Sequence, residues 1–118
     1  MLYINNNRIA ITRGDTGNII LTINQGNELY PSSYVMKDTD KIYFAIEEAN
    51  QPFENAIVKK ILNKDRQRNG KIKIKLNSED TMCLIPGKYF LEIKLVGIDE
   101  FEDEEIQTII PQTEFYIE

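Results

Sequence analysis

The stretch Lys71-Ile72-Lys73-Ile74-Lys75-Leu76 alternates cationic and apolar residues without exception. Successive side chains of a β-strand point to opposite faces, so this alternation is typical of a strand with one buried face and one face in water. The same period returns between residues 88 and 95, where one face would hold Tyr89, Leu91, Ile93 and Leu95. These two segments predict that the chain is built from β-sheets.

Further segments have the same strand character, because each is short and rich in isoleucine or aromatic residues. They span residues 8–13, 17–24, 41–48, 56–62, 105–110 and 114–118. Turn residues separate several of them, at 24–27, 50–52 and 69–70, where asparagine and glycine tolerate positive φ and proline denies the ladder a donor. The sequence therefore predicts about eight strands joined by turns.

Two connections have a character of their own. Residues 77–81 predict a single helical turn, with Asn77 as cap and two acids near the positive end of the helix dipole. Residues 29–40 form the longest stretch without periodicity, with a possible short edge strand at 34–36. Short strands without intervening long helices close most economically as two packed antiparallel sheets, so we expect an all-β sandwich.

Composition limits the function classes. The 118 residues, 42% hydrophobic and 28% charged, fit one domain spanning 1–118. A net charge of -5 disfavours nucleic acid and anionic membranes as partners. The chain contains no histidine, which removes imidazole bases, histidine-activated nucleophiles and histidine metal ligands. We therefore predict that the protein is not an enzyme, has no catalytic residues and needs no cofactor.

The single cysteine and the N-terminus give further expectations. Cys83 has Met82, Leu84 and Ile85 beside it, which predicts a small buried core residue. Residues 1–7 lack the apolar run of a signal peptide, and no segment is apolar and long enough to span a membrane. We expect the chain to be made in the cytoplasm.

Charged motifs are interpreted first as surface turns. Arg13-Gly14-Asp15 spells an adhesion tripeptide, but it directly precedes a predicted strand, where a tight turn with Gly14 at unusual dihedrals is the simpler reading. Residues 99–105 contain six carboxylates, which favour a solvated hairpin tip. The weak calcium candidates there are Asp99, Glu102 and Asp103. The basic cluster at 59–68 lacks interleaved aromatic residues and is expected to be a solvated hairpin end.

Aromatic residues supply the candidates for an interaction surface. Tyr30 and Tyr34 lie in the long connection, where exposed tyrosines favour contacts with proteins or sugars. Phe90 interrupts the polar face of its predicted strand, which leaves two readings: it packs against a loop, or it belongs to an exposed contact patch.

Ordered short phrases along the chain resemble a family of phage proteins. Residues 11–17 with the strand after them are followed by 38–46, then by Pro86-Gly87-Lys88-Tyr89, and finally by Thr108-Ile109-Ile110 before a last strand. This order is similar to the N-terminal immunoglobulin-like domain of baseplate upper proteins, and related small tail proteins, in phages and prophages of Gram-positive bacteria. The resemblance covers nearly the whole chain, but the longer members continue into a receptor-binding-protein attachment region where this sequence ends at Glu118.

The resemblance implies an immunoglobulin-like antiparallel β-sandwich of about eight strands with one short helical turn. It also implies a structural protein of a phage or prophage tail, assembled into the virion. Such a protein would dock to itself, as a possible homo-oligomer, and to neighbouring tail proteins through sheet edges and faces. The alternative is a carbohydrate-binding module for attachment to the bacterial surface, with calcium as a candidate aid to binding.

Overall fold

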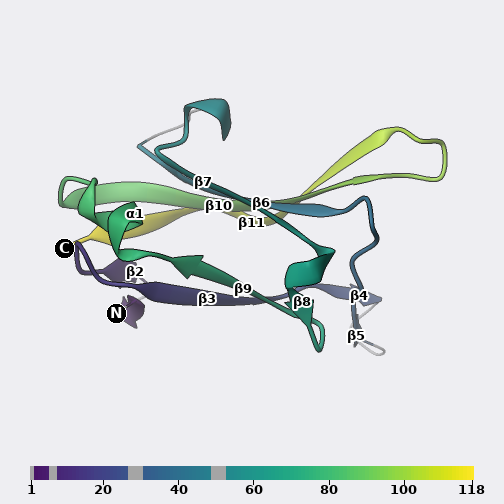
Figure 1. Ribbon diagram of the computed structural model, residues 1–118, viewed down its shortest axis with the longest axis horizontal. Helices are drawn as coiled ribbons and strands as arrows, with labels where there is room; N and C mark the ends of the chain where they lie inside the picture. The colour runs from purple at the N-terminus through teal and green to yellow at the C-terminus, as the bar shows by residue number, and fades with distance from the viewer. Residues whose placement is uncertain (1, 6–7, 27–30, 49–52) are drawn as a thin grey trace.

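The protein is a two-layer β-sandwich in the computed structural model, which describes residues 2–5, 8–26, 31–48 and 53–118 (Figure 1). Its strands are β1 (Leu2–Asn5), β2 (Arg8–Ile11), β3 (Gly17–Thr22), β4 (Asn24–Gly26), β5 (Pro31–Ser33), β6 (Lys41–Glu47), β7 (Val58–Asn63), β8 (Gln67–Arg68), β9 (Lys71–Leu76), β10 (Gly87–Ile98) and β11 (Glu104–Ile117). One helical turn, α1 (Ser78–Met82), and two 3-10 turns, η1 (Phe53–Asn55) and η2 (Lys64–Arg66), complete the described elements.

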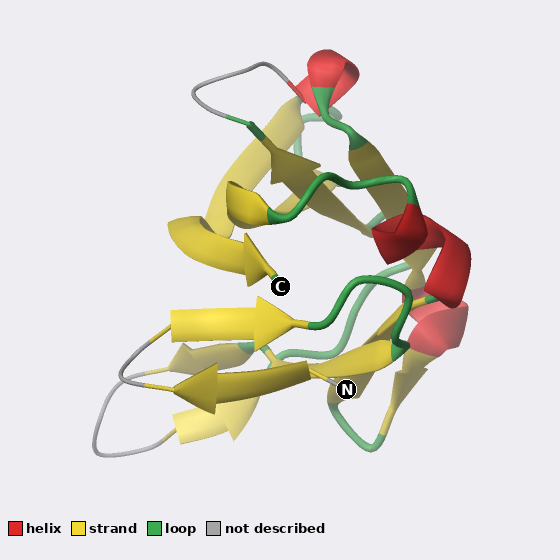
Figure 2. Ribbon diagram, turned by 90° about the vertical axis from the view of Figure 1, so that its left-hand side faces the viewer, coloured by secondary structure: helices red, strands yellow, loops and turns green. Residues whose placement is uncertain are grey.

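The two layers differ in size. The larger sheet has the strand order β1-β2-β11-β10-β6-β7, and the smaller has the order β3-β9-β8. All pairings are antiparallel except that of β2 with β11. A separate two-stranded ribbon joins β4 to β5. Figure 2 shows the layers nearly end-on, with the helical turns gathered on one side. The predicted all-β sandwich is therefore confirmed.

The core lies between the sheets and follows the predicted alternation. In β9 the burial pattern is strictly alternate, with Ile72, Ile74 and Leu76 fully buried and the three lysines exposed. In β10 the apolar face is buried as expected, including Tyr89, whose hydroxyl donates to the Ile85 carbonyl at 2.6 Å. The largest fully buried side chains are Phe44 and Phe115, on the two strands that flank β10 in the larger sheet. Removing these apolar side chains from water is the main stabilising term of the fold.

Two turns have the predicted conformations. Asn69 and Gly70, between β8 and β9, both have positive φ, of 53° and 75°, as a tight hairpin turn between right-twisted strands requires. Gly14 has a φ of +87°, and the backbone amide of Asp15 donates to the Thr12 carbonyl at 3.0 Å. The predicted turn at 13–15 is thus confirmed.

Helical turn α1 holds the turn at 13–15 in place. Thr81, which is completely buried, accepts a hydrogen bond from the Gly14 amide at 2.8 Å and donates to the Asp15 carbonyl at 3.1 Å. Ser78 donates its hydroxyl to the Gly14 carbonyl at 2.7 Å, and the Arg13 Nε donates to the Met82 carbonyl at 2.9 Å. The tripeptide is therefore part of an internal contact rather than a freely presented loop.

The chain around α1 also corrects one expectation. Asp80 accepts a hydrogen bond from the Asn77 amide at 2.7 Å, which closes the start of the helical turn predicted there. Cys83, however, is exposed, so the prediction of a buried core cysteine was wrong. Leu84 takes the inward position instead, at 2% exposure, because the chain leaves the helix at this point and only one of the two neighbours can face the core.

Strand boundaries differ from the prediction in three places. The segment 34–36 is not a strand; the short pairing strand is β5 at 31–33, and its partner β4 occupies most of the expected turn at 24–27. The segments 105–110 and 114–118 form one strand, β11, although Pro111 lies within it. Two register shifts opposite β10 accommodate the proline, because a bulge removes its position from the regular ladder. The expected turn at 50–52 lies outside the described residues.

The contact of α1 with the turn yields a first prediction. Thr81→Val removes the buried acceptor of the Gly14 amide while nearly preserving the side-chain volume. We expect a loss of about 1–3 kcal/mol in the free energy of unfolding, because the amide is left without a partner. Thr81→Ser, which retains the hydroxyl, should lose less. Chemical denaturation of the three proteins measures this, and equal stability of Thr81→Val and wild type would show that the contact does not stabilise the fold.

Candidate interaction surfaces

A hairpin extends from one end of the sandwich, beyond the rest of the sheet (Figure 1). Strand β6 pairs with β10 only as far as Val96, and β2 pairs with β11 only over 115–117. Within the described residues, positions 97–105 are therefore paired only with each other. We call residues 96–106 the hairpin arm. Because the arm contributes little to the core, its length is not explained by folding alone.

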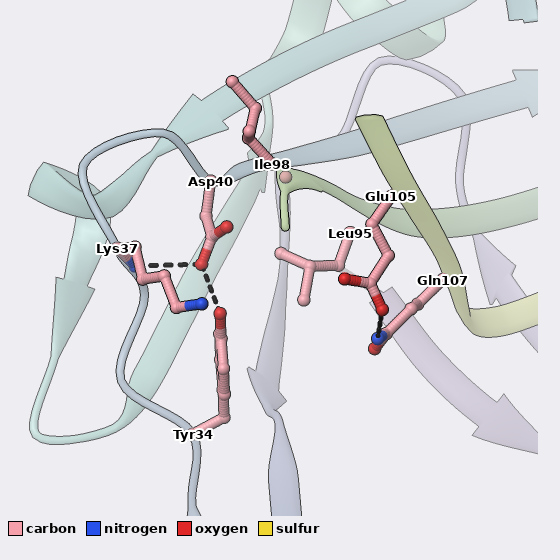
Figure 3. Close-up of a pocket in the computed structure, with 8 residues that line it drawn as sticks. Tyr34, Lys37, Asp40, Leu95, Ile98, Glu105 and Gln107 are labelled. Atoms are coloured by element: carbon pink, nitrogen blue, oxygen red, sulfur yellow. Dashed lines mark hydrogen bonds between the residues drawn. The ribbon is translucent and has the colours of Figure 1, made fainter. Parts of the chain in front are cut away.

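The base of the arm is fixed by a small polar site (Figure 3). Asp40, only 3% exposed, accepts hydrogen bonds from the Tyr34 hydroxyl at 2.5 Å and from the Lys37 amide at 2.9 Å. Its other carboxylate oxygen lies against Gly97 of β10, so closely that a Cβ there would be 2.3 Å from it. A larger residue at position 97 would therefore force Asp40 to shift.

The cavity at this site is too small for a substrate. Its volume is about 50 Å³, and its walls come from both the long connection and the arm. Burial raises the pKa of Tyr34 to about 12, and the hydrogen bond to Asp40 contributes in the same direction. Tyr34, predicted as part of a contact surface, is thus half-buried with its hydroxyl engaged. Tyr34 holds the Asp40 carboxylate, which in turn packs against Gly97 at the base of the arm.

The two faces of the arm differ in chemistry. Cross-strand partners in an antiparallel pair point to the same face. Val96 pairs with Ile106, and Ile98 pairs with Glu104, so one face is mainly apolar. Ile98 is 43% exposed and Ile106 is 56% exposed. At the tip, Phe101 is 81% exposed. Several exposed apolar side chains on one projecting element are typical of a contact surface.

The calcium candidates lie in the loop at the tip of the arm. One oxygen of Asp99 accepts the backbone amides of Phe101 at 2.8 Å and of Asp103 at 3.0 Å. Glu102 has a positive φ of 63°, which completes the tight loop. No group of three or more histidine, cysteine or acidic side chains that could hold a metal ion occurs in the part of the chain that the structure describes. The geometry assigns Asp99 to shaping the loop, and calcium binding stays a prediction.

The remaining aromatic candidates are placed only in part. Phe90 is half-buried on the outer face of the larger sheet, where the Lys88 ammonium lies 5.6 Å from the ring centroid. Glu114, its cross-strand partner, also lies 3.6 Å from Lys88. Phe90 thus contacts neighbouring strand side chains, and it remains a candidate for a contact patch. Tyr30 lies outside the described residues.

One open side of the sandwich exposes the edge of β3. Among the described strands, β3 pairs only with β9. Beside this edge lies an apolar groove of about 280 Å³ between the sheets. We call it the apolar groove; it is lined by Ile9, Asn18, Ile19, Ile20, Leu21, Leu91, Ile93 and Ile110. Ile20 is 58% exposed, so an apolar side chain accompanies an unpaired strand edge.

The other open side is positively charged. A groove of about 410 Å³ separates β7 from β9. We call it the basic groove; it is lined by Lys60, Ile61, Leu62, Arg66, Lys73, Lys75 and Asn77. Lys60 lies 2.8 Å from the Asp80 carboxylate, and no carboxylate is among the lining residues. The cluster at 59–68 therefore gains Lys73 and Lys75 from a different strand, a juxtaposition that depends on how the two sheets pack.

No family model, curated protein or solved structure compared with the chain matches it. In the described segments, no helix is both long and apolar enough to cross a membrane.

The polar site at the base of the arm yields a prediction for alkaline pH. The folded protein raises the pKa of Tyr34 from 10.0 to about 12. Folding therefore favours the protonated phenol, so this stabilisation is complete below pH 10 and is lost as the pH rises through the folded value. We expect wild type to lose stability relative to Tyr34→Phe between these two pH values.

Thermal unfolding of both proteins across this range measures the effect. The difference between them isolates Tyr34, because every other residue is the same in both proteins. A difference in melting temperature that stays constant with pH would contradict the assigned hydrogen bond to Asp40.

Proposed function

We propose that this chain is a non-catalytic structural protein of a phage or prophage tail or baseplate. It is an immunoglobulin-like sandwich that docks to copies of itself and to neighbouring tail proteins through sheet edges and faces. The observation on which the proposal rests is the uncharged edge of β3 beside the apolar groove. The ordered phrases that resemble baseplate proteins supply the biological setting.

The edge of β3 lacks the usual protection against pairing. Natural sheets protect exposed edges with charges, prolines or very short strands. Strand β7, at the edge of the larger sheet, follows this rule with Lys59 and Lys60. Strand β3 has six residues without a charge or a proline. An edge that is left open in this way favours addition of another strand.

A second copy of β3 is the simplest occupant of this edge. An antiparallel pair related by a two-fold axis uses the same segment from both chains. Neither copy brings a charge to the contact, so no like-charge repulsion opposes it. The inward side chains of the added strand would lie beside the apolar groove and remove its lining from water. The smaller sheet would then continue through both copies.

The edge contact leads to a prediction about oligomeric state. Ile20→Lys places a charge on the exposed face of β3, as protected natural edges do. We expect its dimer dissociation constant to rise by about tenfold or more, because pairing would bring two such lysines together. Ile85→Lys introduces the same change at a side chain that is 78% exposed outside β3, and serves as the control.

Sedimentation velocity over a range of protein concentrations measures both variants, with circular dichroism to verify folding. If Ile20→Lys associates as strongly as wild type, the β3 edge is not the contact.

The assignment to a tail has its own test. Particles induced from the bacterium that encodes the chain are purified, and their proteins are quantified by mass spectrometry. We expect the chain at a fixed copy number in each particle, because an assembly with closed symmetry holds a defined number of subunits. Absence from intact particles, with abundant protein in the lysate, would overturn the assignment to the virion.

A further inference from the structure

The tip of the hairpin arm and the basic groove have complementary chemistry. The groove has an apolar part, formed by Ile61 and Leu62, with four cationic side chains around it. The tip has an exposed apolar residue, Phe101, with carboxylates on both sides of it in the sequence. Each surface thus combines exposed apolar side chains with charges, and the charges of the two surfaces are of opposite sign.

The groove contains cationic charge that the described structure does not neutralise internally. Lys60 contacts Asp80, and the nearby Lys64, which does not line the groove, pairs with Asp38. No ion pair of Arg66, Lys73 or Lys75 occurs among the residues that the structure describes. Like charges gathered around a concave surface raise the local potential and attract an anionic partner.

The arm presents its tip in a fixed shape. The two amide hydrogen bonds to Asp99 hold the loop, and the packing of Asp40 against Gly97 holds the base. Little conformational entropy would be lost when such a preorganised element binds, so it binds more tightly than a flexible acidic segment. Phe101 is the kind of aromatic anchor that contributes strongly at interfaces.

We propose that the hairpin arm of one copy of this chain docks into the basic groove of a second copy. The arm cannot fill the groove of its own chain, because it extends from the end of the sandwich and away from β7 and β9 (Figure 1). The contact therefore joins two different surfaces, head to tail. Repetition of such a contact produces a ring if the rotation closes, and a helical filament if it does not.

This contact is independent of the pairing of β3 edges, and it rests on different residues. Attraction between the carboxylates and the cations is screened by salt, whereas apolar strand pairing is not. The two contacts can therefore be distinguished by their dependence on ionic strength.

A charge exchange tests the proposal. One variant, E100K/E102K, leaves four carboxylates and two lysines in the acidic loop at 99–105, and a second variant, K73E/K75E, leaves two cations and two carboxylates around the groove. These substitutions leave Asp99, which shapes the loop, unchanged. Each variant alone should lose most of the head-to-tail association, because one of the two complementary surfaces has lost most of its net charge. Mixed in equal amounts, the two variants should associate again, because the unaltered arm of K73E/K75E meets the unaltered groove of E100K/E102K.

Sedimentation velocity of the variants and of the mixture is the measurement. For wild type we expect the dissociation constant of this contact to rise by about tenfold or more between ~50 mM and ~500 mM salt. The matched control is E48K/E54K, which changes the net charge by the same amount at two exposed side chains outside the arm. It should associate as wild type does. Phe101→Ser should weaken association even at low salt.

Three outcomes would overturn the proposal. The first is a mixture that does not associate more strongly than its separate components. The second is association that is unchanged in both E100K/E102K and K73E/K75E, even if Ile20→Lys abolishes it. The third is a monomeric wild type whose groove retains heparin while K73E/K75E does not, which would assign the groove to an anionic polymer. Failure of the β3 contact alone leaves the charge-dependent recovery on mixing unaffected.

Discussion

The unequal size of the two sheets is the constraint on which the surfaces of this molecule depend. A sandwich buries its apolar faces only where one sheet covers the other. Here a sheet of six strands faces a sheet of three, so the smaller sheet cannot close both sides. One open side exposes β3 and the apolar groove, and the other separates β7 from β9. Both grooves are therefore consequences of the strand count rather than local irregularities.

The hairpin arm follows from a second imbalance, between the lengths of neighbouring strands. Strands β10 and β11 have 12 and 14 residues, whereas β6 has seven. The excess length of β10 and β11 has no neighbour to pair with and extends into solvent. Two register shifts near Ile93 adjust the pairing before the arm begins, and they also admit Pro111. The contact of Asp40 with Gly97 then fixes the arm at the point where the pairing of β10 with β6 stops.

The sequence predicted the features that depend on local chemistry. Strict alternation identified β9, and the glycine and asparagine turns identified Gly14 and Asn69. These predictions succeeded because side-chain period and positive φ are properties of a few neighbouring residues. The same reasoning failed at Cys83, since apolar neighbours do not determine which of them faces inward. It also divided β11 at Pro111, because only the pairing with β10 shows that a bulge accommodates the proline.

The candidate surfaces were less accessible to sequence analysis than the fold. Tyr34 was chosen as an exposed aromatic residue, but Asp40, six residues away, engages its hydroxyl. The basic groove combines Arg66 with Lys73 and Lys75 from a strand that was interpreted only as an amphipathic ladder. Each half had an ordinary explanation as a solvated surface. Their combination across two sheets gives the groove its charge. The sequence alone does not show that these residues of different sheets lie close together.

Net charge is a poor guide to how this protein meets a partner. A total of -5 disfavours capture by nucleic acid at long range. When two surfaces touch, however, salt screens the interaction of each exposed charge with others more than about 10 Å away. The charges near the contact therefore matter more than the total. Six carboxylates gather at 99–105 and four cations line the basic groove, so the same molecule presents two surfaces of opposite sign. Segregation of this kind opposes contact between like surfaces and favours contact between unlike ones. A uniformly acidic surface would repel its own copies in every orientation, whereas this one selects an orientation.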